Sequence, residues 1–503
     1  MKRTLTAAAL TTALAVSAFV GTGFSAPASK STAGASVKAS QAKTYLIAFQ
    51  KDLPHNYETT IAEAGGKVLR ALPEIGGLEA ASSNPAFLDN LKGVAGIQAA
   101  NIQITHKLGY KKIDPAAADG LPVTDIPQPN ETDSYWQYQW DVQRVTHNGD
   151  SYNIETGGAK NANGTVTHKA VVGVIDTGID PDHPDLKGNL LGGGNFVPAG
   201  IDPSEKGDPT DIRDRDGHGT HVAGSIAGNG KVKGIGPNLG IRAYRVFPEN
   251  AGAPTSWIVD AMIQAADDKV DVINMSLGGF DAISRYTYQN TGSYSDAADM
   301  VLWKRAVQYA VNKNVTVVVA AGNESLNLNN PTEITDYMNA EYGYLGFQFK
   351  GASIEVPGQI PGVITVSSSN KWSAEKIAFY SNYGARSISV AAPGGDNGPV
   401  YDETRDLMKR DFHYRTLSTW PTYLEPYFTS NLRSYALLHG TSMASPKVAG
   451  IAGVIKAAEP ELTPSQVAAL ISQTANDYGK PGTDELFGAG EANIYNALLN
   501  IKK

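Results

Sequence analysis

The sequence predicts an α/β fold in which a parallel sheet is flanked by helices on both faces, preceded by a small α+β domain. Short continuous apolar runs recur over residues 135–503, and segments of helical length alternate with them. A separate strand and helix pattern of its own precedes this region. Alternating strands and helices favour a parallel sheet, and continuous apolar runs are typical of strands buried on both faces.

Residues 1–28 have the layout of a secretory signal peptide. Lys2 and Arg3 precede a mildly apolar run, and Ala26-Pro27-Ala28 fits the small-residue signal at which such peptides are cleaved. The alternative is an uncleaved membrane anchor, for which the run is short and rich in Thr. Residues 29–42 are rich in Ser, Ala and Lys, which is typical of a flexible spacer. We therefore expect a secreted, extracellular protein that keeps no membrane attachment after cleavage.

A small α+β domain is predicted over residues 43–105. Segments of strand character alternate there with two segments of helical character, an order typical of helices packed on one face of a sheet. The predicted strands are 45–49, 67–72, 78–82 and 94–99, and the predicted helices are 56–64 and 85–91. Residues 106–134 contain Pro, Ala and Asp with little periodicity, so we expect an exposed linker that carries one or more maturation sites.

Residues 135–503 carry the pattern of the parallel sheet. The predicted strands are the apolar runs 170–175, 271–275, 315–320, 363–366 and 388–391. The predicted helices are 218–227, 256–267, 295–312, 443–457 and 463–474. The last helix opens with Thr463-Pro464, a favourable cap followed by a favourable first-turn residue.

The overall composition excludes several classes of function. The chain has 503 residues, a formal net charge of -8 and no cysteine. The acidic balance argues against nucleic acid as a partner. The lack of cysteine excludes disulfides, thiolate metal sites and cysteine nucleophiles.

Three segments place a reactive side chain where a strand ends or a helix begins. Asp176 ends a buried apolar run, and His218 lies among glycines at the start of a predicted helix. Ser442 lies in His439-Gly440-Thr441-Ser442-Met443-Ala444, before an apolar helix. A histidine can remove the proton of a serine hydroxyl, and a buried carboxylate can hold that histidine in the required tautomer. The combination indicates nucleophilic catalysis by serine.

The three segments resemble the signature segments of the subtilisin-like serine proteases (subtilases), in the order Asp, His, Ser that this family uses. Two further segments strengthen the resemblance: Ala320-Ala321-Gly322-Asn323-Glu324 and Asn274-Met275-Ser276-Leu277-Gly278-Gly279. Five segments in the correct order are far more specific than any single motif. The resemblance covers roughly residues 135–503 and implies a subtilisin-like fold.

The resemblance implies a role for each matched residue. Ser442 corresponds to the nucleophile, His218 to the general base and Asp176 to the carboxylate that orients the histidine. Asn323 corresponds to the side chain that, with the N–H of Ser442, stabilises the oxyanion. The residues matched to substrate binding are Ser276, Leu277, Gly278, Ala320 and Gly322.

Each of these residues also has an ordinary structural interpretation. Asp176 could be a turn carboxylate, Ser442 a helix N-cap, and Asn323 a residue of a left-handed turn. Their joint occurrence favours the functional interpretation. His221, three residues after His218, is expected to pack in the interior, since no third ligand accompanies it to form a zinc site.

The resemblance also assigns a role to residues 43–105. They are similar to the ferredoxin-like, inhibitor-like prodomain of the family, which aids folding and blocks the active site before it is removed. A permanent N-terminal domain is the alternative.

Calcium is an open question, and no metal is required for the chemistry. Asp185 matches an aspartate that ligates a structural Ca²⁺ in many relatives. The expected partner loop, residues 229–234, is short and contributes two lysines, which oppose a cation. The acidic residues of 208–216 could bind a cation elsewhere, although solvation is the expected role.

The sequence departs from the compact members of the family in other ways. Extra segments at 281–299, 325–355 and 395–435 are expected either to border the substrate or to decorate the surface. Lys447 follows Pro446 where many degradative members have histidine, a pattern similar to that of proteases that trim lantibiotic leader peptides.

We interpret the chain as a monomeric, secreted serine endopeptidase that acts on protein or peptide substrates through an acyl-enzyme. The small residues around the predicted substrate site favour apolar side chains next to the cleaved bond. The alternatives are a dedicated processing protease for a precursor peptide and an inactive, peptide-binding pseudo-protease.

Overall fold

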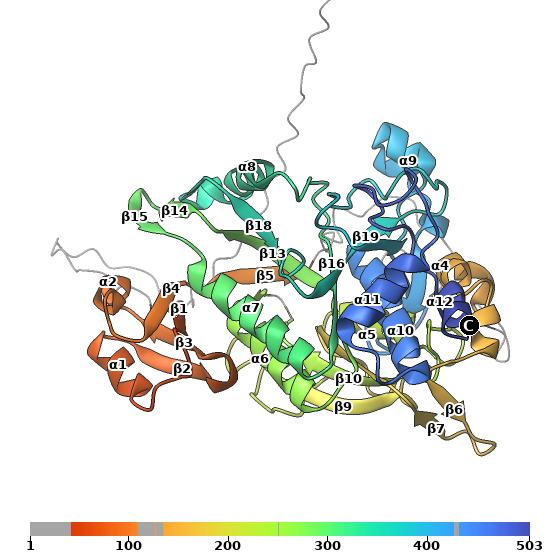
Figure 1. Cartoon of the computed structure of the whole chain (residues 1–503), viewed down its shortest axis with the longest axis horizontal. Helices are drawn as coiled ribbons and strands as arrows, with labels where there is room; N and C mark the ends of the chain where they lie inside the picture. The colour runs from red at the N-terminus through yellow and green to blue at the C-terminus, as the bar shows by residue number, and fades with distance from the viewer. Residues whose placement is uncertain (1–41, 109–125, 127–133, 250, 427–431, 503) are drawn as a thin grey trace, which may run out of the picture. The chain divides into compact units, whose positions relative to one another are not determined.

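The structure is a computed structural model, and it describes residues 42–108, 126, 134–249, 251–426 and 432–502 (Figure 1). The predicted signal peptide (1–28) and most of the predicted linker lie outside the described residues. Among the described residues, no helix combines the length and the apolar character that a membrane span requires.

A parallel sheet of seven strands forms the centre of the larger domain, in the order β20-β19-β16-β12-β8-β10-β9. Every neighbouring pair in it is parallel. Its strands are β8 (Val171–Asp176), β9 (Leu190–Asn195), β10 (Gly240–Arg245), β12 (Val272–Met275), β16 (Thr316–Ala320), β19 (Val363–Ser369) and β20 (Val390–Pro393). Val172 and Val174 of β8 join the core on one face, while Ile175 joins the core on the other. Burial on both faces explains the continuous apolar runs.

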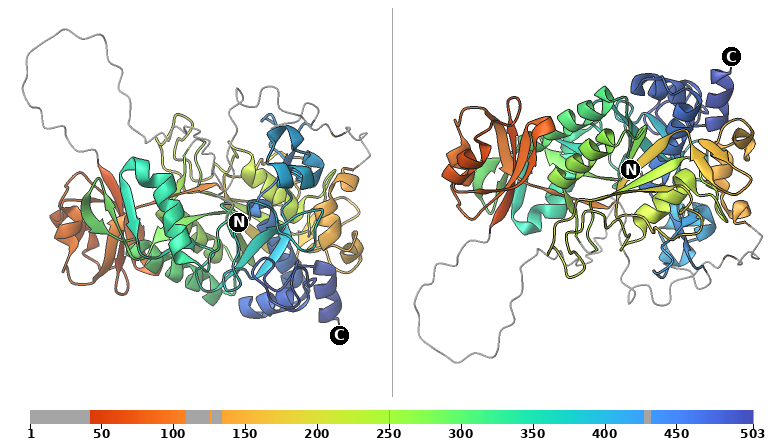
Figure 2. Two further views of the ribbon diagram at one scale, coloured as in Figure 1. Left: turned by 90° about the horizontal axis from the view of Figure 1, so that it is seen from above. Right: turned by 90° about the horizontal axis from the view of Figure 1, so that it is seen from below.

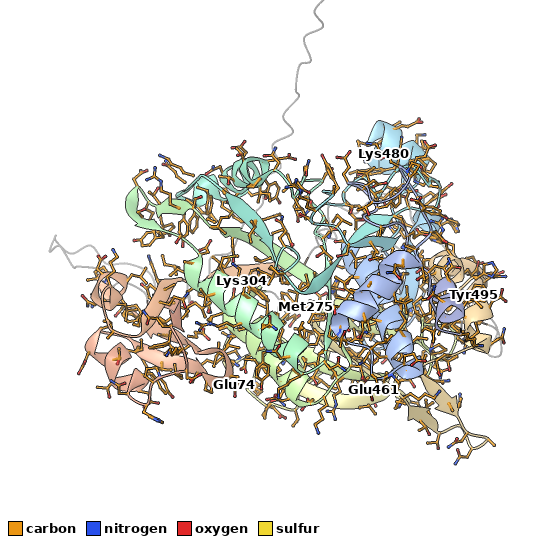
Figure 3. The ribbon with its side chains drawn as sticks, in the orientation of Figure 1. Glu74, Met275, Lys304, Glu461, Lys480 and Tyr495 are labelled. Atoms are coloured by element: carbon orange, nitrogen blue, oxygen red, sulfur yellow. The ribbon has the colours of Figure 1, made fainter. Side chains whose placement is uncertain are left out.

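Helices cover both faces of this sheet, as predicted. On one face lie α5 (His218–Ala227), α10 (Thr441–Ala458) and α11 (Pro464–Gln473). On the other face lie α6 (Thr255–Asp267) and α7 (Ala297–Asn312), which run side by side in Figures 1 and 2. Met275, the last residue of β12, is fully buried and is labelled near the middle of Figure 3.

The N-terminal domain is a four-stranded antiparallel sheet with two helices on one face, in the order β2-β3-β1-β4. Its elements are β1 (Lys43–Phe49), α1 (Tyr57–Glu63), β2 (Lys67–Leu72), β3 (Gly77–Ser82), α2 (Phe87–Leu91) and β4 (Ile97–Ile102). Alternate residues of β1 serve two cores. Tyr45, Ile47 and Phe49 pack in the core of this domain, whereas Leu46 and Ala48 join the core that contains α6 and α7.

Strands from distant parts of the chain form another four-stranded sheet, in the order β11-β5-β13-β18. Its strands are β5 (Thr105–Leu108), β11 (Ala253–Pro254), β13 (Leu277–Ala282) and β18 (Ser353–Val356), and β5 is antiparallel to both of its neighbours. Residues 106–134 were predicted to form a linker, but residues 106–108 belong to β5. A four-residue strand has too little periodicity to be recognised, and its partners are distant in the sequence.

The extra segments form ordered structure. The hairpin β14 (Arg285–Tyr288) and β15 (Thr291–Tyr294) forms a three-stranded sheet with β17 (Phe347–Lys350). The remaining elements are α4 (Trp140–Val145), β6 (Gly158–Lys160), β7 (Val166–His168), α8 (Pro331–Tyr342), α9 (Pro399–Thr404), β21 (Thr416–Thr419), β22 (Tyr435–Leu438) and α12 (Ile494–Ile501). Since β18 pairs with β13, residues 325–355 extend the sheet that holds β5. They border β13, which separates them from β5.

Candidate active site

Asp176 and His218 meet where β8 ends and α5 begins. The His218 Nδ1 atom lies 2.7 Å from Asp176 Oδ1, and both side chains are fully buried. The other ring nitrogen, Nε2, is the one that can act as a base. Burial lowers the pKa of His218, but the charge and hydrogen bond of Asp176 outweigh it and raise the pKa above its usual value. A carboxylate in this position fixes the tautomer with the proton on Nδ1.

Two local features bring α5 against the end of β8. Asp214 accepts hydrogen bonds from the backbone N–H groups of Gly217 and Thr220, at 2.8 and 2.9 Å, and so ties the loop to the first turn of the helix. At Gly219 a Cβ atom would lie 2.1 Å from the carbonyl oxygen of Gly178, so only glycine allows this approach.

Ser442 is the second residue of α10. Its Oγ donates to the carbonyl oxygen of Ser276 at 3.1 Å, and the Ser276 Oγ donates back to the Ser442 carbonyl at 2.8 Å. Met443 and Ala444 share a core with Val222 of α5, so the two helices pack together. The N-terminus of a helix favours negative charge, which suits an oxyanion beside Ser442.

Asn323 follows β16 and is bound to the residue before Ser442. Its Oδ1 atom accepts from the Thr441 N–H at 2.8 Å and from the Thr441 hydroxyl at 3.0 Å. Because the amide oxygen is engaged by Thr441, the Nδ2 amino group is the end that can donate to a substrate oxygen. Gly322 has a φ of 95°, which lets the chain turn at this point.

The residues matched to substrate binding lie on both sides of this arrangement. Leu277 and Gly278 of β13 pair with Leu108 and Lys107 of β5. Ala320 ends β16, and Gly322 donates its N–H to the Thr441 hydroxyl at 3.2 Å. Strand β5 of this chain therefore pairs with the backbone of Leu277 and Gly278, which was predicted to bind substrate.

No role was predicted for Asp214, because the acidic residues of 208–216 were expected to be solvated. The structure buries Asp214 completely and uses it to cap α5. An acidic residue two to four positions before a helix start was the available signal. His221 is buried and faces the Ala436 carbonyl through Nε2 at 3.1 Å, and burial lowers its pKa to about 3.

Lys447 forms a buried ion pair. Its Nζ atom lies 2.8 Å from Asp141 Oδ2 of α4, and both side chains are buried. From the sequence, Lys447 was recognised only as a departure from the family pattern. Its partner lies far away in the sequence, so no local pattern could reveal the pair.

Asp185 accepts hydrogen bonds from two groups of the larger domain. Its Oδ2 atom accepts from the Val232 N–H at 2.9 Å and from the Tyr435 hydroxyl at 3.2 Å. These bonds hold the carboxylate against residues 232 and 435. In the part of the chain that the structure describes, no three His, Cys, Asp or Glu side chains are grouped so as to hold a metal ion.

Comparison with known proteins gives consistent matches. A family model described as "Subtilase family" matches residues 167–490. The nisin leader peptide-processing serine protease NisP of Lactococcus lactis subsp. lactis is 34% identical over 64% of this chain, and the match covers 44% of that protein's own length. A thermophilic serine proteinase of Bacillus sp. (strain AK1) is 30% identical over 78% of this chain and 77% of its own length.

A solved structure extends the likeness to the N-terminal domain. The epidermin leader peptide processing serine protease EpiP of Staphylococcus aureus superposes with a TM-score of 0.72 at 26% identity, covering 92% of this chain and 99% of that one.

Proposed function

This chain belongs to the subtilase family of serine proteases, and from that premise we propose that it is a secreted endopeptidase whose nucleophile is Ser442. The observation that carries the proposal is the buried pair of His218 and Asp176, at 2.7 Å, beside a helix that begins with Thr441 and Ser442. The same arrangement argues against a pseudo-protease, because no member of the set has been replaced.

The reaction uses the geometry of these side chains. The Ser442 hydroxyl turns from the Ser276 carbonyl toward His218, and His218 Nε2 removes its proton as the oxygen attacks the carbonyl carbon of the peptide bond. Asp176 holds the ring and stabilises the imidazolium that forms. The developing oxyanion accepts hydrogen bonds from Asn323 Nδ2 and from the Ser442 N–H. His218 then gives its proton to the leaving amine, and water releases the acyl group by the same steps in reverse order.

A serine-directed probe tests this proposal. Intact mass is measured for the wild-type chain, for Ser442→Ala and for Ser465→Ala, each with and without a fluorophosphonate. Ser465 is an exposed serine on a different helix and serves as the matched control. We expect one probe molecule on the wild type and on Ser465→Ala, and none on Ser442→Ala. Equal labelling of all three proteins, or lack of labelling after residues 1–134 are removed, would refute the assignment.

The N-terminal domain is proposed to inhibit the enzyme until it is removed. Its support is β5, which lies between β11 and β13 and pairs with the main chain expected to bind substrate. A peptide that adds a strand to a sheet gains main-chain hydrogen bonds regardless of its sequence. Wild-type protein is expected to lose its N-terminal segment, while Ser442→Ala keeps it. The signal-like residues 1–28 support secretion, and the two lysines of 229–234 argue against calcium at Asp185.

Processing of a precursor peptide is the second candidate function. Two proteins similar to this chain are named as leader peptide-processing proteases, and one of them matches nearly the whole chain. Digestion of a library of proteome-derived peptides, followed by mass spectrometry, separates the candidates. A narrow consensus around the cleaved bond would support processing, and cleavage after many apolar residues would support general degradation.

A further inference from the structure

His106 is the side chain of β5 that the larger domain encloses. Its relative exposure is only 1%, although Thr105 before it is exposed. His106 pairs in register with Ala253 of β11, and Leu108, two residues later, pairs with Leu277 of β13. Its environment is therefore built by the strand neighbours and by the helices behind them.

Four residues from three separate segments contact the imidazole ring or the group that it binds. His106 Nε2 lies 2.8 Å from the Thr255 hydroxyl, and Thr255 donates to Asp299 Oδ1 at 2.6 Å. Trp303 packs edge-on against the ring with 5.5 Å between centroids. A Cβ atom at Gly279 would lie 2.7 Å from His106 Nδ1, so a glycine there leaves room for the ring. We call Thr255, Gly279, Asp299 and Trp303 the imidazole site.

The hydrogen bonds fix the polarity of this site. Thr255 uses its single proton on Asp299, so its oxygen must accept from His106. His106 is therefore the neutral tautomer with its proton on Nε2, which agrees with burial lowering its pKa to about 4. The site thus requires a hydrogen-bond donor at the position of Nε2.

Asp299 is the acceptor that anchors the chain of hydrogen bonds. In the full chain its Oδ2 atom also accepts from Asn101 Nδ2 of the N-terminal domain at 2.5 Å, a bond that is lost when that domain leaves, whereas Thr255 lies in the larger domain and remains as a donor to Asp299. Burial and then Asp299 raise the pKa values of Asp281 and Asp296 well above the usual range. Burial also raises the pKa of Asp299 itself, to about 6.

We infer that the imidazole site is a substrate subsite that selects a histidine two residues before the substrate residue paired with Leu277. The inference rests on the proposed function, in which a substrate strand takes the place of β5 once the N-terminal domain has left. An aliphatic side chain would bury the Thr255 oxygen without a donor.

The test compares synthetic peptides on the active enzyme that the full chain produces. The parent peptide has the sequence of residues 103–112, Gln-Ile-Thr-His-Lys-Leu-Gly-Tyr-Lys-Lys. In one version thienylalanine, a five-membered ring without an N–H, replaces the histidine. In a control version alanine replaces the threonine before it, whose counterpart Thr105 is exposed.

We expect kcat/KM to fall by about 10- to 100-fold for the thienylalanine peptide, the range for a buried acceptor left without its donor. The control should stay within about threefold of the parent, as is usual for an exposed side chain. In the enzyme variant Thr255→Val the ratio between parent and thienylalanine peptides should fall to near one. If that variant does not fold, the peptide series on wild-type enzyme still decides the question.

The outcomes separate the two hypotheses. If the fluorophosphonate labels Ser442 and all peptides are cleaved at equal rates, the subsite is refuted and the proposed function stands. If the enzyme is labelled but cleaves none of them, the peptides are compared as competitors of labelling, and equal inhibition again refutes the subsite. If Ser442 is not labelled at all, the proposed function fails, and the subsite that rests on it fails too.

Discussion

The ion pair of Lys447 and Asp141 provides a quantitative test of how the N-terminal end of the larger domain is held to the helix of Ser442. The two charges are 2.8 Å apart and both are buried. At an effective dielectric constant of about 20, their attraction is about 6 kcal/mol before the cost of desolvation. Removing one partner leaves the other buried and unpaired, which typically costs about 3–5 kcal/mol. We therefore expect Lys447→Met to lower the free energy of unfolding by about 3–5 kcal/mol.

A double-mutant cycle isolates the interaction itself. Lys447→Met, Asp141→Leu and the double variant are made in the Ser442→Ala background, which prevents self-digestion. Urea unfolding is followed by tryptophan fluorescence. Because the double variant buries no unpaired charge, it should be more stable than either single variant, with a coupling energy of at least about 2 kcal/mol.

An exposed ion pair serves as the control for this cycle. Lys313 and Asp267 are 2.5 Å apart but 40% and 38% exposed, so their coupling should be below about 1 kcal/mol. Similar coupling energies for the two pairs, or a double variant as unstable as the sum of the single variants, would refute the reasoning. Burial would then have no bearing on the strength of these pairs.

Three further predictions concern the active site and one helix. Asp176 raises the pKa of His218 above its usual value of 6.5, and the histidine must be deprotonated to act as a base. A pH–rate profile should therefore show kcat/KM falling as the pH drops through a value above 6.5. Asp176→Asn should lower kcat by about 10⁴ and move this fall to lower pH. Asn323→Ala should lower kcat by about 10²–10³, the range known from subtilisin itself, with little change in KM, and a wild-type kcat would exclude the oxyanion role. Thr463 caps α11 by accepting from the Gln466 N–H, so Thr463→Ala should cost about 1 kcal/mol in urea unfolding and Thr463→Ser should cost less; equal stability of both variants would contradict the cap.

The parallel sheet was predictable because its strands are buried on both faces. Runs such as residues 170–175 consist of apolar residues and glycine, so both the strand and its burial can be predicted from the sequence. Helix α5 was predicted with its observed bounds, and all ten of its residues, His218, Thr220, His221 and Ser225 included, are buried. The strand predicted at 94–99 is instead Ile97–Ile102, because Gly96 turns the chain with a φ of 92°.

The parts that were not predicted depend on partners that are distant in the sequence. The strand Thr105–Leu108 has no strong pattern of its own and is ordered by β11 and β13. The same holds for Lys447, whose charge is compensated by Asp141. His106 gave no signal, since a single histidine in a polar segment predicts an exposed side chain. Only tertiary contacts distinguish these residues from their neighbours.

The core shared by the two domains has a consequence for the order in which the chain folds. Neighbouring strands of the parallel sheet are joined through long crossovers, so each pairing closes a large loop and forms slowly. The antiparallel strands β1 and β3 are closer in sequence and are synthesised first. Once that sheet has formed, Leu46 and Ala48 provide an apolar surface against which Leu302 and Trp303 of α7 can pack. We therefore expect residues 43–108 to act as a template that accelerates refolding of residues 135–503, even when the template is supplied as a separate chain and is absent from the final product.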